Sequence, residues 1–185
     1  MAGEVLAITY FREGKYVQAF SSYGGARRGT PVSTFIRVDT EPVRERCDII
    51  EPDAIVCFDP SLLSPALMSG AGPDTVILIN STRAPEQFAD MGDHRFATLD
   101  ALAVAQKNGV GRFVNSAILG AFAKVMGSPD VEFLAEVVRD VSPARKNENA
   151  AAVLDGYQMV RIKGEEGSGL VAAVATSAGA EGASA

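Results

Sequence analysis

The sequence predicts an α/β protein with a doubly wound, Rossmann-like sheet and a helical C-terminal part. Three short runs, at residues 54–58, 75–80 and 95–99, have the composition of buried parallel strands. Segments with helical signals separate these runs, and the connections between them are short. This alternation of strand and helix is typical of the α/β class.

The N-terminal part is expected to form one helix and two strands. Residues 4–12 are periodic in apolar side chains and are followed by Gly14, which is a C-cap signal. Residues 16–20 are predicted as a strand that leads into a glycine-rich loop. Residues 31–38 alternate and are rich in β-branched side chains, which indicates a second strand.

The remaining helices are predicted from periodicity and from residues that cap or break helices. They are a short helix at 62–68, a helical turn at 85–89, and helices at 100–108, 115–126, 130–138 and 147–160. Residues 1–163 are expected to form one domain. Residues 164–185 are almost entirely small or polar and are expected to be a disordered tail.

Charge and cysteine content limit the classes of function. The 185 residues carry a formal net charge of −6, which argues against nucleic acid as a partner. No apolar run has the length that a bilayer-crossing helix needs, so no membrane association is expected. Cys47 and Cys57 are too few to hold an iron–sulfur cluster, which usually takes four thiolates. Two cysteines without a disulfide framework fit a cytoplasmic protein.

The loop that joins the first two predicted strands is the strongest candidate for a contact surface. It contains several glycines, which allow close backbone approach, and the adjacent pair Arg27 and Arg28. Arginine and aromatic side chains are enriched at protein interfaces. The alternative is a solvent-exposed loop in which the glycines only turn the chain.

Polar residues follow two of the predicted buried strands. Asp59 comes after the first, and Asn80, Ser81 and Thr82 come at the end of the second. Ligands of open α/β sheets bind outside the carboxyl ends of the strands, but these residue types are also preferred helix N-caps. Capping is the favoured interpretation for Asp59, and the two interpretations are equal for the other three. The single histidine, His94, is expected to be structural.

Two segments of the chain resemble a known family. They are QAFSSYGGARRGTPVSTFIRV and EPVRERCDIIEPDAIVCFDPSLL, which are similar to the gamma subunit of thiamine-dependent 2-oxoacid:acceptor oxidoreductases. The members of this family include pyruvate, 2-oxoisovalerate, 2-oxoglutarate and phenylglyoxylate oxidoreductases. The resemblance runs over residues 4–162. Its most specific parts are Tyr23-Gly24, Arg27-Arg28-Gly29-x-Pro31, Glu51-Pro52-Asp53 and Asp59-Pro60.

One departure from the family pattern is large. Family members open with a strand and a Gly-rich turn, whereas this sequence starts inside the helix that follows them. Either the start of the sequence has been placed too late, or this subunit lacks the first strand and the turn. In both cases no phosphate-binding role is carried over from the turn.

The resemblance implies oxidative decarboxylation of a 2-oxoacid, such as pyruvate or an aryl 2-oxoacid, to an acyl-coenzyme A. Such complexes carry thiamine diphosphate, Mg²⁺ and [4Fe–4S] clusters, use coenzyme A as a substrate, and pass electrons to ferredoxin, or to NAD through FAD. The implied partners are thiamine-binding alpha and beta subunits, a ferredoxin-like delta subunit and, in an NAD-linked enzyme, an NAD/FAD subunit.

This chain is expected to bind no cofactor alone and to supply no catalytic residue. It would pack on the catalytic subunits and help to enclose the active site with a loop that contains Ser22, Tyr23, Gly24, Arg27, Arg28 and Gly29. A pure scaffold without contact to the active site is one alternative. Another is a stand-alone α/β domain that binds a small anion or a nucleotide.

Overall fold

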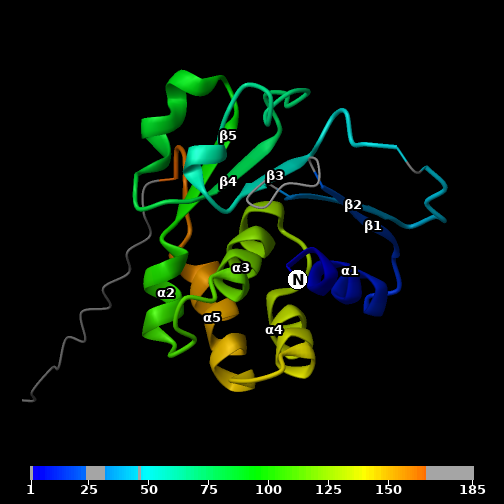
Figure 1. The fold of residues 1–185 in the computed structure, drawn as a ribbon, viewed down its shortest axis with the longest axis vertical. Coiled ribbons are helices and arrows are strands. Elements are labelled where there is room, and N and C mark those ends of the chain that lie inside the picture. The colour runs from blue at the N-terminus through cyan, green and yellow to red at the C-terminus, as the bar shows by residue number, and fades with distance from the viewer. Residues whose placement is uncertain (1, 24–31, 46, 166–185) are drawn as a thin grey trace, which may run out of the picture.

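A computed structural model describes residues 2–23, 32–45 and 47–165 (Figure 1). The proposed tail therefore falls almost wholly outside the described residues. In chain order the elements are α1 (Ala2–Arg12), β1 (Tyr16–Tyr23), β2 (Val32–Asp39), β3 (Ala54–Cys57), the 3₁₀ helix η1 (Pro60–Leu62), β4 (Val76–Asn80), the 3₁₀ helix η2 (Pro85–Met91), β5 (Arg95–Leu99), α2 (Ala101–Lys107), α3 (Asn115–Met126), α4 (Val131–Val141), α5 (Lys146–Met159) and β6 (Arg161–Ile162).

The central sheet has the strand order β3-β4-β5-β6. β3, β4 and β5 are parallel, and β6 joins β5 in the antiparallel sense. The side chains of β4 are buried on both faces, as expected for an inner parallel strand. The predicted α/β class and the helical C-terminal part are confirmed. Whether the chain lacks a first strand stays a prediction.

The two faces of this sheet have different covers. Leu78 and Leu99 point to the face that packs against α2 and α3. Ile77 and Phe96 point to the other face, where Phe88 of η2 is among the covering residues. The second cover consists of 3₁₀ helices and turns, so it is thinner than the helical one.

The predicted helix at 62–68 is wrong. The chain forms η1 and then a series of turns up to Gly70. Pro65 has no amide hydrogen, and it forces Ser64 away from the helical region of backbone space, so a helix cannot run through this pair. The predicted helical turn near Pro85 is confirmed as η2. β6 was missed because two residues are too few to show a strand period.

The C-terminal helices form a second core. α3 and α5 cross so closely that a Cβ atom on Gly120 would lie less than 3.0 Å from the Val153 carbonyl oxygen, closer than real Cβ atoms come. A Cβ atom on Gly156 would clash in the same way with the Ala117 carbonyl oxygen. α1 and α4 pack on the same core through residues such as Leu6 and Leu134 (lower part of Figure 1).

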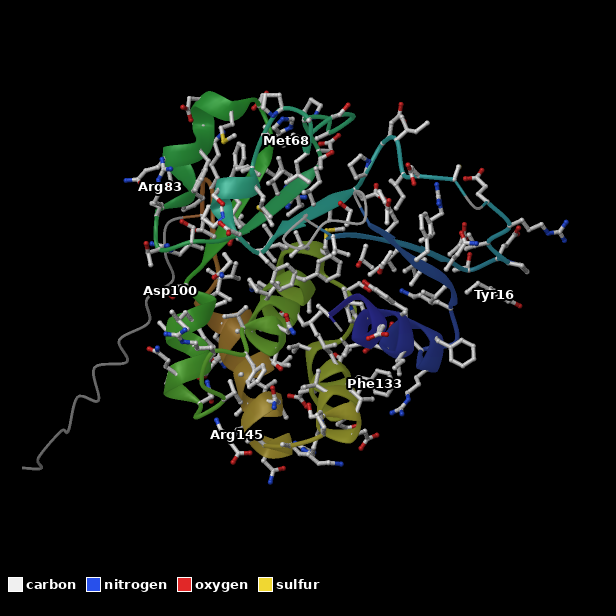
Figure 2. All side chains as sticks on the ribbon, viewed as in Figure 1. Tyr16, Met68, Arg83, Asp100, Phe133 and Arg145 are labelled. Carbon is white, nitrogen blue, oxygen red and sulfur yellow. The ribbon has the colours of Figure 1, made fainter. Side chains whose placement is uncertain are left out.

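The β1–β2 hairpin is a separate two-stranded sheet beside this body. One face packs against the core that contains α1, through Val17 and Ile36. On the other face Phe20 and Phe35 stack with ring centroids 5.2 Å apart. Figure 2 labels Tyr16 at the outer end of the hairpin, away from the helical body. No helix in the described residues is both long and apolar enough to cross a bilayer.

Candidate functional site

The β1–β2 hairpin holds the proposed contact loop. β1 ends at Tyr23 and β2 begins at Val32, and these two residues are paired across the hairpin. Ser22 is exposed and pairs with Ser33. The loop between the strands, with Gly24, Arg27, Arg28 and Gly29, lies outside the described residues.

The hairpin is anchored on both of its faces, which fixes the two strands on either side of the proposed contact loop. Arg37 of β2 donates to the carbonyl oxygens of Cys47, at 2.6 Å, and Asp48, at 3.2 Å. These bonds bind the segment that follows β2 back onto the strand. Together with the packing of Val17 and Ile36 against the helical core, they fix the direction of both strands that lead to the loop.

Asp59, at the carboxyl end of β3, is a helix cap. Its Oδ1 accepts from the Ser61 backbone N–H at 2.9 Å at the start of η1. Hydrogen bonds from Ser61 lower the pKa of the Asp59 carboxyl. The capping interpretation, which the sequence favoured, is confirmed. The neighbouring Cys57 thiol donates to the Asp59 carbonyl oxygen at 3.0 Å, and burial raises its pKa.

Asn80 connects three segments at the same edge of the sheet. Its side-chain amide donates to the Phe58 carbonyl oxygen at 3.1 Å, and its Oδ1 accepts from the Ala101 N–H at 3.1 Å. The first bond reaches the end of β3, and the second reaches the start of α2. Asn80 thus uses both ends of its amide inside the protein.

Ser81 and Thr82 form the loop after β4. The Ser81 hydroxyl accepts from the Arg83 N–H at 3.1 Å, and Ser81 is buried. Thr82 is exposed, and its carbonyl oxygen accepts from Arg161 at 2.9 Å. The structure therefore brings Asp59, Asn80, Ser81 and Thr82 to one edge, where most of their polar atoms serve the fold.

Arg161 is a member of this edge that sequence reasoning missed. Its Nη2 donates to the carbonyl oxygens of Thr82 and Arg83 at 2.9 Å each, and of Ser81 at 3.4 Å. The guanidinium thus holds the loop that follows β4 against β6. About 80 residues separate the donor from these acceptors, and no local signal could have predicted the contact.

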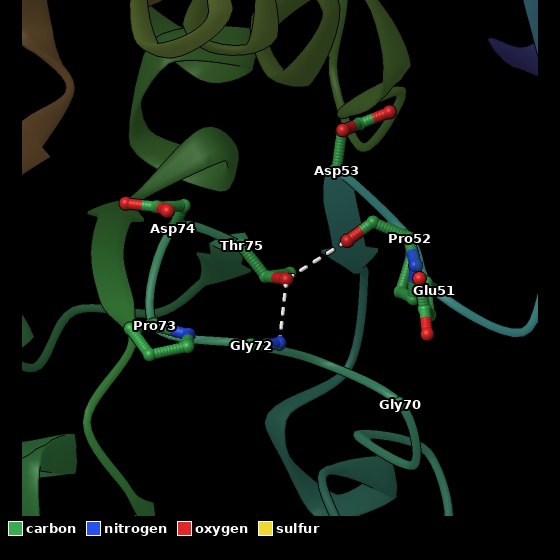
Figure 3. A pocket seen from close by; sticks show the side chains of 8 residues that line it. All are labelled: Glu51, Pro52, Asp53, Gly70, Gly72, Pro73, Asp74 and Thr75. Carbon is green, nitrogen blue, oxygen red and sulfur yellow. Dashed lines mark hydrogen bonds between the residues drawn. The ribbon is translucent and has the colours of Figure 1, made fainter.

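A shallow cavity of about 390 Å³ lies at the opposite edge of the sheet, where the strands begin (Figure 3). Its walls include the Glu51-Pro52-Asp53 motif and the loop before β4. The Thr75 hydroxyl donates to the Pro52 carbonyl oxygen at 2.8 Å and accepts from the Gly72 N–H at 2.9 Å. The motif therefore joins the segments that precede β3 and β4, and its carboxylates point to solvent.

His94 supports the same region. Its Nδ1 lies 2.8 Å from the Gly72 carbonyl oxygen, and its ring meets Phe96 edge-on at 5.8 Å. The structural interpretation of His94 agrees with both contacts.

The residues described do not fit a resident metal or cluster. Among them, no three His, Cys, Asp or Glu side chains converge as a metal site would require. Cys57 is buried in the sheet and Cys47 is exposed beyond β2, and neither forms a disulfide.

Comparison with known proteins gives consistent matches. The family model for pyruvate ferredoxin/flavodoxin oxidoreductase matches residues 1–159. The pyruvate/ketoisovalerate oxidoreductases common subunit gamma of Pyrococcus furiosus is 34% identical over 166 residues, which cover 87% of this chain and 90% of the relative. The pyruvate synthase subunit PorC of Methanothermobacter thermautotrophicus is 36% identical over 162 residues, with 86% and 87% covered.

Solved structures show the same similarity. The pyruvate oxidoreductase subunit PorC of Thermotoga maritima superposes with a TM-score of 0.78 at 29% identity, over 88% of this chain and 89% of that one. A 2-oxoglutarate:ferredoxin oxidoreductase of Magnetococcus marinus superposes with a TM-score of 0.65 at 17% identity. That match covers 84% of this chain and 27% of the other, and it shows a shared fold alone.

Proposed function

Because the chain belongs to the pyruvate ferredoxin/flavodoxin oxidoreductase family, we propose that it is the gamma subunit of a multi-subunit 2-oxoacid:ferredoxin oxidoreductase. The observation that carries the proposal is the match to gamma-type relatives along about nine tenths of their length. The assembled enzyme would oxidise and decarboxylate a 2-oxoacid and form an acyl-coenzyme A.

The cofactors are assigned to the other subunits. Thiamine diphosphate with Mg²⁺ and the [4Fe–4S] clusters would supply the carbanion and electron-transfer chemistry when bound there. The side chains described here do not converge on a metal site. This chain would contribute a packed domain, and its role would be structural and positional.

The loop at the end of the hairpin is proposed to face the thiamine-binding subunits. Two observations support this placement. The hairpin is anchored on both faces by Arg37 and by apolar packing, and the polar groups at the carboxyl edge of the sheet are largely used in internal bonds. Arg27 and Arg28 would present planar, permanently charged donors to carboxylate or phosphate groups of the partner.

The loop assignment is tested by the double variant Arg27→Ala/Arg28→Ala, assayed for assembly and for turnover. We expect a complex of normal composition with lower 2-oxoacid-dependent reduction of ferredoxin, because donors near the active-site enclosure are lost. Loss of assembly alone would make the loop an interface anchor. Unchanged assembly and turnover would remove the loop from the site.

The subunit assignment is tested by reconstitution. The other subunits are purified from cells that lack this chain and are assayed for pyruvate-dependent and other 2-oxoacid-dependent reduction of ferredoxin, with and without the added chain. Activity that depends on the chain supports the proposal. Equal activity in both samples contradicts it. A flavin assay on the active sample separates an NAD-linked enzyme from a ferredoxin-linked one.

A further inference from the structure

The loop that joins α2 to α3 meets the loop that joins α4 to α5 at the end of the helical body away from the sheet (lower part of Figure 1). Figure 2 labels Arg145 at this end. The Arg145 guanidinium donates to the Gly109 carbonyl oxygen, 36 residues away in the sequence. A Cβ atom added to Gly111 would lie 3.7 Å from Arg145 Nη1. The two loops therefore form one surface.

Phe113 is exposed on this surface, although the loop around it is anchored. Its side chain is 66% exposed, whereas Val110 in the same loop is fully buried. The Val110 N–H donates to the Ala105 carbonyl oxygen at 2.9 Å. Gly109 and Gly111 both have positive φ, a conformation that glycine adopts without strain. The loop thus presents an aromatic ring to solvent from a backbone that is fixed beneath it.

The same surface is positively charged. Residues 109–115 contain one charged side chain, Arg112, and residues 141–147 contain two, Arg145 and Lys146. Glu148 follows in the first turn of α5, so the two loops and this turn have a net charge of +2, from three cations and one carboxylate. The whole chain has a net charge of −6. The surface is a basic–aromatic patch made of Arg112, Phe113, Arg145 and Lys146.

The cations of the patch have no carboxylate partner in the described part of the chain. Arg112 makes no hydrogen bond or ion pair there. Arg145 binds a neutral carbonyl group of the facing loop. Lys146 donates to the Asp140 carbonyl oxygen at 3.3 Å, while the Asp140 carboxylate lies 2.9 Å from Arg12. The patch can therefore pair with carboxylates of another molecule.

We propose that the basic–aromatic patch is a docking site for another subunit of the same oxidoreductase complex, one that presents an apolar pocket with carboxylates around its rim. The Phe113 ring enters the pocket, and Arg112 and Arg145 pair with the rim. Aromatic and arginine side chains dominate the energy of interfaces, and groups held in place before binding lose less entropy. The inference rests on the proposed function, because the partner belongs to the same complex.

The chemistry of the patch fits an acidic protein surface and not a polyanion. Nucleic acids and anionic membranes are bound through many cations at once. The patch has three cations around one aromatic ring, on a chain whose net charge of −6 repels a polyanion. A few carboxylates around an apolar pocket match both the number of cations and the ring.

Two further occupants fit the patch poorly. A symmetric contact between two copies would place the cations of one patch against those of the other, and like charges repel. The segment 166–185 of the same chain contains two carboxylate side chains, Glu166 and Glu181, which are 15 residues apart. It does not supply a rim of carboxylates around an apolar pocket.

An additional strand finds no pairing partner at the patch. A strand must satisfy its backbone groups on a neighbouring strand, and the α2–α3 and α4–α5 loops contain no strand. The central sheet lies at the other end of α5, whose 14 residues span about 21 Å. A strand that joined β3 to β6, wherever in the chain it came from, would lie with that sheet.

Hydroxyl-radical footprinting tests the contact directly, because it measures the exposure of the Phe113 ring. The isolated chain is compared with the complex purified from cells that express it. Phe113 is expected to be labelled about tenfold less, or lower still, in the complex, since a central anchor of an interface is fully desolvated. Equal labelling in the two samples overturns the proposal. Weak labelling in the isolated chain overturns it too, because the chain would then cover its own patch.

Two variants test the energy of the contact. Phe113→Ala and Arg112→Glu change exposed side chains, so folding should persist. Binding of each to the other subunits, purified from cells that lack this chain, is expected to weaken by about tenfold or more. Added salt should weaken binding of the wild-type chain more than binding of Arg112→Glu. Leu102→Ala on α2 and Arg95→Glu at the start of β5 are the matched controls and should bind normally.

The outcomes separate this proposal from the proposed function. If the wild-type chain does not bind the other subunits, both fail together. If the wild-type chain binds and Phe113→Ala and Arg112→Glu bind equally well, the docking proposal alone is overturned. Loss of binding in these two variants, with normal binding of both controls, supports it.

Discussion

Single side chains hold together segments that are distant in the sequence. Asn80 joins β3 and β4 to α2 with its two amide atoms. Arg161 donates hydrogen bonds to carbonyl groups of the loop after β4. Thr75 holds the loop that precedes β4 with two hydrogen bonds of its hydroxyl group. Polar residues whose sequence pattern suggests a ligand site can thus have their polar atoms used in hydrogen bonds within the protein.

The ion pair between α2 and α5 predicts a dependence of stability on pH. Asp155 lies 3.0 Å from Lys107 Nζ and accepts from Asn108 at 2.7 Å. Burial raises the pKa of the Asp155 carboxyl, but the bonds from Asn108 and Lys107 outweigh it, so the pKa is lowered. A lowered folded-state pKa stabilises the protein above the unfolded-state value, and this contribution is lost as the pH falls through the folded-state value.

Asp155→Asn is therefore expected to reduce the free energy of unfolding by about 1 kcal/mol at neutral pH. The difference from the wild type should shrink as the pH falls through the lowered folded-state pKa of Asp155, because the native carboxyl then gains a proton and loses its charge. Urea unfolding at neutral pH and at a series of lower pH values measures this difference, with the exposed Asp74→Asn as control. A difference that stays constant with pH would contradict the role of the charge.

Thr98 offers a second prediction at this scale. It is fully buried in β5, and its hydroxyl oxygen has no hydrogen-bond partner among the described residues. Thr98→Val keeps the shape and removes an unsatisfied polar atom, so we expect unchanged or higher stability, by up to about 1 kcal/mol. A loss of more than this in thermal unfolding would reveal an unseen partner for the hydroxyl.

The sequence predicted individual residues well where the interaction is local. Asp59 contacts a backbone group two positions away, and short-range capping rules describe that contact. Short-range rules of this kind could not predict the contacts of Arg161 or the buried position of Thr98. Their environments are made by strands and loops that only the folded sheet brings together.

Elements are fixed by close backbone contact as well as by side-chain pattern. At the crossing of α3 and α5, Gly120 and Gly156 each face a carbonyl group of the other helix. Helix propensity alone would favour alanine at both positions by about 1 kcal/mol. The close approach of the two helices reverses this preference, because a Cβ atom at either position would overlap a backbone carbonyl group of the other helix.

Gly120→Ala and Gly156→Ala are each expected to lower the free energy of unfolding by about 3 kcal/mol or more, since the helices must separate. Gly72→Ala is the matched control, because a Cβ atom added there would meet nothing within 4 Å. Urea unfolding of the three variants measures the effect. Wild-type stability in either helix variant would show that the crossing is looser than described.

Prediction of the elements succeeded where period and caps agreed. The bounds of α3 and β5 match the predicted ranges. The helix expected at 62–68 is absent, because Pro65 has no amide hydrogen and disfavours helical backbone at Ser64. The continuation of β1 to Tyr23 was missed, because Ser21 and Ser22 carry little strand signal and cross-strand pairing decides their conformation.

At the scale of the whole molecule, a sheet with unequal covers carries a hairpin at its side (Figure 1). The fold class followed from the alternation of strands and helices. The function did not follow from composition or from the polar strand ends, which largely serve the fold. The function was indicated by two motifs. One of these, Glu51-Pro52-Asp53, has a structural role, because the Pro52 carbonyl oxygen accepts a hydrogen bond that links the segments before β3 and β4.

The central claim is that the chain works as a subunit of a 2-oxoacid oxidoreductase. The most direct measurement is affinity purification of the chain from cells that express it, followed by native mass spectrometry and assays for iron and thiamine diphosphate. The account predicts further subunits in fixed ratio, with stoichiometric iron and thiamine diphosphate. A lone chain free of iron would contradict it.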